Sequence, residues 1–448
     1  MKSKLTIFLL LSLLITVTIT PSVLASDTLS LQEAVEIALQ ENGSLKTSSL
    51  DTEISELNIS SARRNLLPEL DFTTSFSRGE QESPMDELAE ENPMFDTGSD
   101  GGPQNTYSNQ FSLQMPIYMG GDILRGIDQS RMGSEISHLQ QEEEKSRIIL
   151  QVATAYHELI LARERVKIEE KALELVADHK QEIKANIEEG LVLEDDLLQA
   201  EIQEDEGKIS LTEAENALEV ARENLALLLG RDELAREPGR TGPEPELELD
   251  RDKLLNIAAE NSINLQILDL NREITEKNLE GEKYNFLPDV ALNGDYSTRG
   301  EEPEFKDGDW SLTLSGSFNL FDGGKSGIEE QKYEKELEQN REDRENLNRQ
   351  LGIEVKQKLL ETRNNERRIE IREKNLENAS ENLRRQEARY QEGMGKNLDV
   401  LEAQNTLRQT ELGLKQAEIN YKLNLYELLD VTGQLTKFWE EELSADAN

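Results

Sequence analysis

The side chains that most often carry chemistry are scarce in this 448-residue sequence. It has no Cys and three His, which excludes disulfides, thiolate metal sites and Cys nucleophiles and leaves little for zinc. His138, His157 and His179 are widely spaced on a stretch without Pro, so one long helix would hold them several turns apart. No phosphate-binding loop, nucleophile elbow or metal motif is present. The sequence therefore predicts a protein that is not an enzyme and uses no cofactor or resident metal.

Carboxylates are abundant, and one pair has a spacing suited to cations. Asp399 and Glu402 are three positions apart, so both lie on one face of a helix. Symmetry that brought several copies together would make an acidic ring that attracts cations. The alternative is that they are two solvated acids among 92. Adjacent acids such as Asp195 and Asp196 point in different directions and do not indicate catalysis.

The overall charge excludes further classes of protein. Against 92 acidic residues stand 49 basic ones, a formal net charge of −43. Nucleic-acid binding is disfavoured, because phosphate recognition needs clustered Lys and Arg. A mean hydropathy of −0.66 disfavours a bundle of transmembrane helices. What remains is a polar, acidic chain that is too long for one compact core.

The N-terminal segment, up to Ala25, predicts export. Lys2 and Lys4 precede an apolar stretch, and Val23-Leu24-Ala25 fits the small-x-small rule for cleavage. We expect a signal peptide that is cleaved near Ala25. The alternative, a retained membrane anchor, fits less well because a polar chain follows the cleavage site at once.

The rest of the chain contains an internal duplication. Residues 65–70 (NLLPEL) recur as residues 285–290 (NFLPDV) at an offset of 220. Gly120-Gly121 and Glu189-Gly190 recur at an offset of 203. The difference between the two offsets predicts an insertion in the first copy, within the acidic segment 79–107, which is typical of a solvated loop.

Each copy has one order of elements: helix, strand, loop, strand, very long helix, Gly turn and long helix. The first repeat spans 29–232, and the second spans 249–434. A linker rich in Pro, Gly and Glu covers 233–248, and 435–448 is expected to be a short C-terminal tail. The expected strands lie at about 70–78, 108–118, 289–298 and 310–320.

The helices have the lengths and pattern of coiled coils. The stretch 122–189 contains no Pro, and as one helix it would be about 100 Å long. A returning helix over 194–229 covers half of that, and a helix over 33–64 could fill the rest. Apolar positions step by three and four along the last helix of each repeat, in the same register in both copies, which indicates a seam with other helices. These positions are Leu211, Ala214, Leu218, Ala221, Leu225 and Leu228, and Leu414, Ala417, Tyr421, Asn424, Leu428 and Val431.

The four strands alternate apolar and polar residues. The clearest runs from Trp310 to Leu320, and its length is that of a transmembrane β-strand. A soluble sheet packed on a helix fits the strands alone equally well. In lipid, however, a sheet must close on itself, and four strands cannot do so. Strands that span a membrane would therefore require several chains.

This layout resembles the TolC-like outer membrane efflux protein family (outer-membrane factors). The resemblance rests on the duplicated NxLP–strand–strand–GG–long helix–Gly–helix order and on the run from Gly393 to Asp399-Val400-Leu401-Glu402-Ala403. It implies a mostly α fold with a small β part. Three protomers would build a periplasmic α-barrel and give four transmembrane strands each to one twelve-stranded barrel in outer-membrane lipid. It further implies a passive exit duct for efflux or type I secretion, a homotrimer coupled to a periplasmic membrane-fusion adaptor and an inner-membrane transporter.

The resemblance also assigns roles to residues. Asp399 and Glu402 resemble the acids that ring the closed entrance. Asp196 and Tyr390 resemble an acid and an aromatic that latch the gate by a hydrogen bond. The family's basic latch residue falls at Gly395, which is a departure and leaves only the Tyr390–Asp196 link. The tip turns that would dock the adaptor contain Gly190, Leu191, Gly393, Met394 and Gly395.

One alternative stays open from the residues. A secreted coiled-coil scaffold would explain the heptads, the charge and the signal peptide, but it would not explain four amphipathic strands at matched places. The cargo is not readable from the sequence, because the pump that selects it is another polypeptide.

Overall fold

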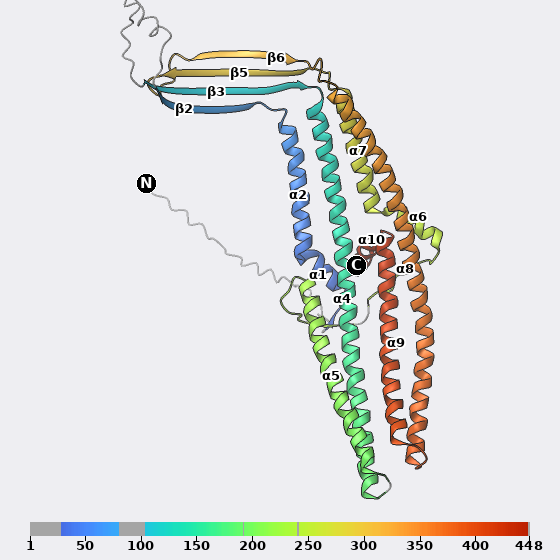
Figure 1. Ribbon diagram of the computed structural model, residues 1–448. Helices are drawn as coiled ribbons and strands as arrows, with labels where there is room; N and C mark the ends of the chain where they lie inside the picture. The colour runs from blue at the N-terminus through green and yellow to red at the C-terminus, as the bar shows by residue number, and fades with distance from the viewer. Residues whose placement is uncertain (1–27, 80–103, 191, 240–241, 447–448) are drawn as a thin grey trace, which may run out of the picture.

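In the computed structural model, the chain is a long helical rod with a small sheet at one end. The structure describes residues 28–79, 104–190, 192–239 and 242–446. Figure 1 shows the sheet lying across the top, with helices descending from one of its ends to two hairpin tips. The expected signal peptide, most of the segment 79–107, and Leu191 lie outside the described residues.

The two repeats match element by element. The first contains α1 (Leu31–Glu41), α2 (Gly43–Arg64), β2 (Glu69–Gly79), β3 (Gln104–Met119), α4 (Asp122–Glu188) and α5 (Glu194–Leu228). The second contains α6 (Arg251–Asn261), α7 (Ile263–Lys283), β5 (Asp289–Gly300), β6 (Asp309–Ser317), α8 (Lys325–Gln391) and α9 (Asn397–Val431). α4 and α8 have 67 residues each, and α5 and α9 have 35 each. The helix lengths therefore agree with the constant offset between the copies that the sequence shows.

The first helix of each repeat is broken, where the sequence indicated one helix over 33–64. Asn42 has an extended backbone between α1 and α2. Its side-chain oxygen accepts from Ser44 N at 2.9 Å and so caps α2, while its Nδ2 donates to Leu228 O at 2.9 Å. Ser262 makes the corresponding break between α6 and α7. The break lets the upper helix follow the rod while the short helix below it packs into the core.

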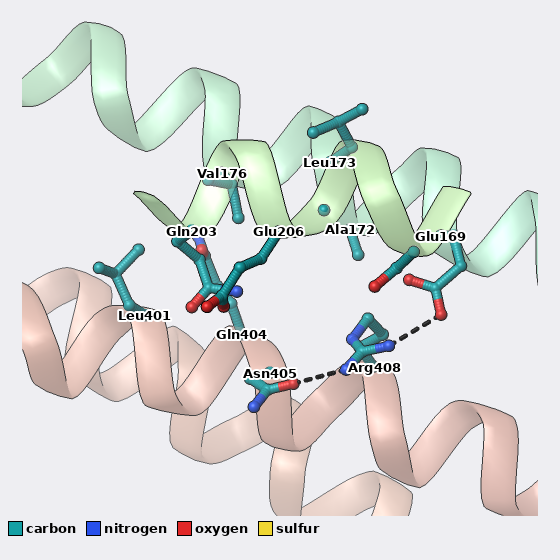
Figure 2. A pocket seen from close by; sticks show the side chains of 12 residues that line it. Glu169, Ala172, Leu173, Val176, Gln203, Glu206, Leu401, Gln404, Asn405 and Arg408 are labelled. Carbon is teal, nitrogen blue, oxygen red and sulfur yellow. Dashed lines mark hydrogen bonds and ion pairs between the residues drawn. The ribbon is translucent and has the colours of Figure 1, made fainter. Parts of the chain in front are cut away.

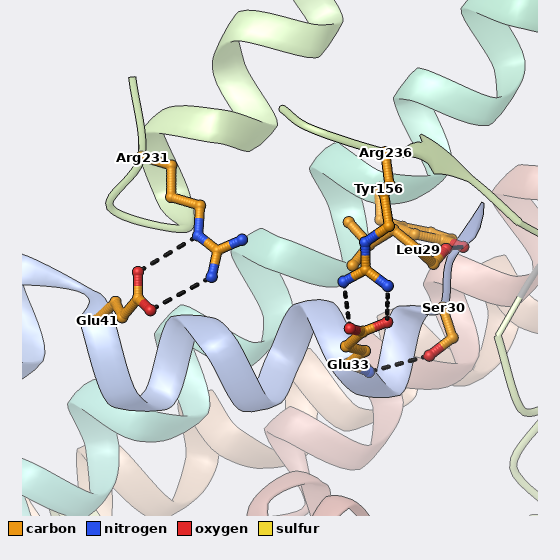
Figure 3. Close-up of polar contacts among 7 residues, drawn as sticks. All are labelled: Leu29, Ser30, Glu33, Glu41, Tyr156, Arg231 and Arg236. Atoms are coloured by element: carbon orange, nitrogen blue, oxygen red, sulfur yellow. Dashed lines mark hydrogen bonds and ion pairs between the residues drawn. The ribbon is translucent and has the colours of Figure 1, made fainter. Parts of the chain in front are cut away.

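The largest core lies half-way along the rod. It joins α1, α4, α5, α9 and α10 through buried residues that include Val35, Val152, Leu159, Leu225 and Tyr426. Figure 3 shows the polar contacts that fasten α1 and the linker to this core.

Polar contacts in this region tie distant parts of the chain together. Glu33 forms a two-pronged ion pair with Arg236 of the linker. The buried Tyr156 hydroxyl donates to Leu29 O at 2.7 Å and accepts from Gly239 N at 3.1 Å. β1 (Thr28–Leu29) pairs with β4 (Glu237–Pro238), so the start of the first repeat is joined to the linker.

The segment expected as a C-terminal tail contains a helix, α10 (Leu435–Asp446). Leu435 and Trp439 are fully buried in the central core. The Trp439 ring lies 5.8 Å from that of Tyr426. α10 is therefore part of the core, because its apolar side chains cover parts of α1, α4 and α9 that would otherwise face water.

The sheet has the order β2-β3-β5-β6, and all its pairs are antiparallel. Its register aligns Phe72, Phe111, Tyr296 and Trp310 in one row across the four strands. The Phe72 and Phe111 rings are 4.7 Å apart. β6 ends at Ser317 instead of the expected residue 320, because Asp289, the first residue of β5, pairs with Ser317 and Pro288 before it has no N–H to extend the ladder.

One face of the sheet is apolar and exposed. Phe72, Trp310, Leu312 and Leu314 are 49–77% exposed on it. The opposite face is polar, and Gln110 Nε2 donates there to Asp295 Oδ1 at 3.1 Å. In the described part of the chain, no helix has a stretch apolar and long enough to cross a lipid bilayer.

Candidate gate at the hairpin tips

Two glycine turns form the end of the rod that lies away from the sheet (Figure 1). Gly190 and Gly393 have φ of +74° and +70°, a conformation that favours glycine. In the second turn, Met394 N and Gly395 N both donate to Arg389 O at 2.8 Å. Both turns therefore reverse the chain within a short segment, and the second leaves Met394 65% exposed.

Gly395 has a packing reason to be glycine. A Cβ at this position would lie 2.9 Å from Tyr390 N and 3.1 Å from Arg389 C. Those atoms belong to the helix backbone, so a side chain at position 395 would require the turn to shift. The turn thus disfavours a side chain at the position where the family pattern has a basic one.

A separate apolar cluster holds the two hairpins together above the turns. It includes Ile183 of α4, Ala200 of α5, Leu383 of α8 and Val400 of α9, all buried. The hairpins of one protomer therefore form a four-helix unit at the tip, and α4 is packed against α9.

The polar centre of this unit is Asn397, which is 3% exposed at the start of α9. Its Nδ2 donates to Asp196 O at 3.0 Å and to Gln199 Oε1 at 3.2 Å, both on α5. Its Oδ1 lies 2.9 Å from Nε2 of His179 on α4, and it must accept this hydrogen bond because a carbonyl oxygen has no proton to donate. We call this set of contacts the Asn397 knot, and it joins α9 to both helices of the first hairpin.

Tyr390 belongs to the same region, but not through the expected hydrogen bond. Its hydroxyl is buried, and no hydrogen bond joins it to Asp196. The ring packs edge-on against His179, with centroids 4.9 Å apart. The pKa of Tyr390 is raised, first by burial, while the neighbouring Asn186 side chain opposes the shift and the charge of Asp196 adds to it. Tyr390 and Asp196 are thus close, and Asn397 supplies the direct link between the hairpins.

Asn397 and His179 carried little signal in the sequence. A polar residue in the first turn of a helix is ordinary, and the three His were expected to stay apart on one helix. That expectation holds: His138 is exposed, His157 is fully buried in the central core and His179 is at the tip. Only the packing of α4 against α9 brings His179 to Asn397, which lies far along the chain.

The expected acidic pair lies on the same helix as the knot. Asp399 is half-buried and Glu402 is exposed, one turn apart on α9. Among the residues that the structure describes, no three His, Cys, Asp or Glu side chains gather as a metal site. Within one protomer, Asp399 and Glu402 thus lie near the tip without a third such side chain among the described residues.

Comparisons with known proteins agree with this architecture. The family model described as outer membrane efflux protein matches residues 34–231 and 254–434. No curated protein matches the chain. Among solved structures, CusC aligns with a TM-score of 0.76 and 17% identity, over 90% of this chain and 92% of that one.

Two further structures come from named organisms. The CmeC outer membrane channel of Campylobacter jejuni has a TM-score of 0.75 and 16% identity, over 92% of this chain and 89% of that one. The MtrE outer membrane channel of Neisseria gonorrhoeae, in its open state, has a TM-score of 0.70 and 21% identity, over 90% and 89%. The family match covers both repeats, and the structures share the fold along nearly the whole chain. This chain belongs to the outer membrane efflux protein family, whose members are passive channels of the outer membrane.

Proposed function

We propose that three copies of this chain form the outer-membrane exit duct of a tripartite efflux or type I secretion system. The duct is a passive conduit, closed at its periplasmic tip and coupled there to an adaptor and an inner-membrane transporter. The observation that carries the proposal is that one protomer leaves two surfaces without a partner at the sheet and two at the helices, which we call its unfinished flanks. In each case, one flank can pair with the other flank of a neighbouring copy.

The unfinished flanks of the sheet are its edge strands. β2 and β6 each pair on one side only within the described part of the chain. Their free N–H and C=O groups would be unpaired in lipid. Pairing β6 of one protomer with β2 of the next would satisfy them, and three protomers would close a twelve-stranded barrel. The exposed apolar face, with Trp310 and Leu314, would then face outer-membrane lipid, and the polar face would line the channel.

The unfinished flanks of the helices are α5 and α8, which lie on opposite sides of the lower rod (Figure 1). Ile202, Ile209 and Val220 of α5 are 56–61% exposed. Ile353, Leu360 and Ile371 of α8 are 47–67% exposed. Intervals of about two and three helical turns keep the side chains of each set on one helix face. The two flanks are different surfaces, so a contact between them is heterologous, and it gives a closed ring when the rotation between neighbouring protomers closes.

Charge favours the same pairing. α5 carries 11 acidic and 2 basic residues. The lower part of α8, residues 353–391, carries 8 acidic and 10 basic residues. This segment is therefore slightly basic, although the chain has a net charge of −43. The acidic flank of one protomer would meet the basic flank of its neighbour.

The tip would act as the gate. Around a three-fold axis, Asp399 and Glu402 would place six carboxylates at the entrance and attract cations. Asp196 and Tyr390 form the latch region together with the Asn397 knot, which must break or shift if the two hairpins separate. The turns with Gly190, Leu191, Gly393, Met394 and Gly395 would dock the adaptor.

A photocrosslinking residue placed at Ile209 tests the assembly in intact cells. The proposal predicts crosslinks from Ile209 to peptides of α8 in another copy of the chain, in species of up to three chains. Ile371→Glu should weaken them, because it places a charge in the apolar stripe at the level of Ile209, as the contact between Arg372 and Gly413 of α9 indicates. Crosslinks only within one chain would contradict the assembly. Other proteins captured from the tip turns would identify the adaptor.

A further inference from the structure

A small cavity above the tip has the features of an ion site. It lies between α4, α5 and α9 and has a volume of about 110 Å³. Gly207 of α5 helps to keep it open, because a Cβ there would lie 3.1 Å from Leu173 Cδ1. Figure 2 shows Glu169 and Arg408 at one end of this cavity and Gln203, Glu206 and Gln404 gathered at the other.

The basic residue that lines the cavity, Arg408, is already paired with other lining residues. Arg408 Nη1 donates to Glu169 Oε1 at 2.8 Å, and Nη2 donates to Asn405 Oδ1 at 2.8 Å. The Glu169 side chain is 2% exposed, so this carboxylate depends on Arg408 for its charge balance. The Glu169–Arg408 pair is neutral as a unit and leaves no cation for the other end.

The other end holds a buried acceptor without a partner. Gln404 is 5% exposed. Its Nε2 donates to Leu175 O at 3.3 Å, which fixes the orientation of the amide. Its Oε1 is buried, and the described residues offer it no hydrogen-bond partner. Buried polar atoms in native proteins are satisfied, by protein, water or an ion, so this oxygen calls for a ligand.

The remaining lining groups show which ligand fits. Glu206 adds a carboxylate at the mouth, and Gln203 and Ser210 add neutral oxygens. An anion is excluded by the free charge of −1, and a soft metal by the lack of N and S ligands. Ca²⁺ and Mg²⁺ sites usually have more carboxylates or bound phosphate. One carboxylate with neutral oxygens suits a monovalent cation.

We infer that this cavity binds one Na⁺ or K⁺ ion, held by Gln404 Oε1 and Glu206, with water completing the shell. The volume has room for an ion and a few waters, at about 30 Å³ per water. The ion bridges α5 and α9, which belong to different hairpins, and so braces the tip unit. The binding site rests on the cavity alone, whereas an effect of the ion on channel opening rests on the proposed function.

Thermal unfolding of the purified full chain tests the site. Midpoints are compared in NaCl, KCl and N-methyl-D-glucamine chloride at equal ionic strength, so that general screening of the −43 charge is constant. We expect the midpoint in Na⁺ or K⁺ to be higher by about 1–2 °C when the ion is in tenfold excess over its dissociation constant. No difference between the three salts would overturn the inference.

Variants separate this site from the other acids. Gln404→Met and Glu206→Gln should each remove the cation-specific difference, and Glu206 is exposed, so its variant folds without a cavity defect. Glu213→Gln, an exposed acid elsewhere on α5, should keep it. A difference that persists in Glu206→Gln and Gln404→Met would overturn the site.

Anomalous scattering from crystals grown in RbCl locates the ion directly. A peak between Gln404 Oε1 and Glu206 supports the inference, and density without an anomalous signal would show water only and reject it. Neither outcome depends on channel activity. The ion site can therefore be rejected while the proposed duct is supported, and the duct can be rejected while the ion site is supported.

Discussion

The side-chain amide of Asn397 donates a hydrogen bond to the main-chain oxygen of Asp196, at 3.0 Å. The two residues belong to different repeats and different hairpins, so this contact joins the repeats where the channel would close. It uses a backbone acceptor, so it does not depend on the side chain at 196. The hairpins are thus linked through a residue for which the family resemblance implied no role.

Asn397→Ala should loosen the closed tip. The change leaves Asp196 O and the His179 ring without their partner, a loss of about 1–3 kcal/mol per protomer. That corresponds to a shift of about 5–150-fold in the ratio of open to closed channel. Conductance in planar lipid bilayers measures it.

Two controls accompany this variant. Tyr390→Phe removes a hydroxyl that makes no hydrogen bond to Asp196 and should leave conductance near that of the wild type. Asn382→Ala changes an exposed amide of α8 at the repeat position of His179 and should do the same. A large effect of Tyr390→Phe together with none of Asn397→Ala would restore the hydroxyl latch and reject the Asn397 knot.

Gly395→Ala should destabilise the second turn. Its Cβ would meet the backbone of Tyr390 at 2.9 Å, so the turn must shift. We expect a lower thermal midpoint and a higher closed-state conductance. Gly133→Ala is the matched control, because its Cβ meets nothing within 4 Å in the interior of α4, and it should stabilise the helix by up to about 1 kcal/mol. Equal midpoints for the two variants would show that the turn tolerates a side chain.

His157 should make the central core sensitive to acid. Burial lowers the pKa of His157 to about 4, although the hydrogen bond to Ala153 O opposes this shift. As the pH falls, the His157 imidazole therefore takes up a proton near pH 6.5 in the unfolded chain, but only near pH 4 in the folded one. The stability of the fold thus decreases as the pH drops from about 6.5 towards 4. The loss attributable to this residue is about 3 kcal/mol per protomer.

His157→Leu should flatten that part of the pH profile of the thermal midpoint. His138→Ala, which removes an exposed His of the same helix, should leave the profile unchanged. If His157→Leu loses stability in acid as steeply as the wild type, carboxylates elsewhere set the profile.

The paired acids of α9 are expected to bind cations at the entrance. Asp399→Ala combined with Glu402→Ala should abolish the block of trimer conductance by divalent cations. Asp51→Ala combined with Glu53→Ala, which removes the same charge from exposed positions of α2 away from the tip, should keep the block. Block that survives in the first double variant would assign it to other carboxylates.

The sequence predicted the parts of the fold that follow from local pattern. Gly190 and Gly393 marked the turns, and the long helices α4 and α5 begin and end close to the expected positions, because positive φ and the absence of Pro act locally. The break at Asn42 was missed, since its amide is satisfied by Leu228 O, on a helix far along the chain.

The candidate site was predictable only in part. The position of the tip follows from the repeat, so Asp399, Asp196 and Tyr390 were expected near it. The Asn397 knot and the burial of Trp439 depend on which helices pack together, and a single sequence does not show such contacts. The resemblance implied a hydrogen bond between Tyr390 and Asp196, whereas the structure places Asn397 between the hairpins.

Single-particle imaging of the full chain, extracted in detergent and placed in lipid nanodiscs, tests the central claim most directly. The account predicts three chains around one axis, with β6 of each protomer paired to β2 of the next in a closed twelve-stranded barrel, and α5 packed against α8 of a neighbour. Monomers with open sheet edges, or filaments recovered from the aqueous fraction, would contradict it.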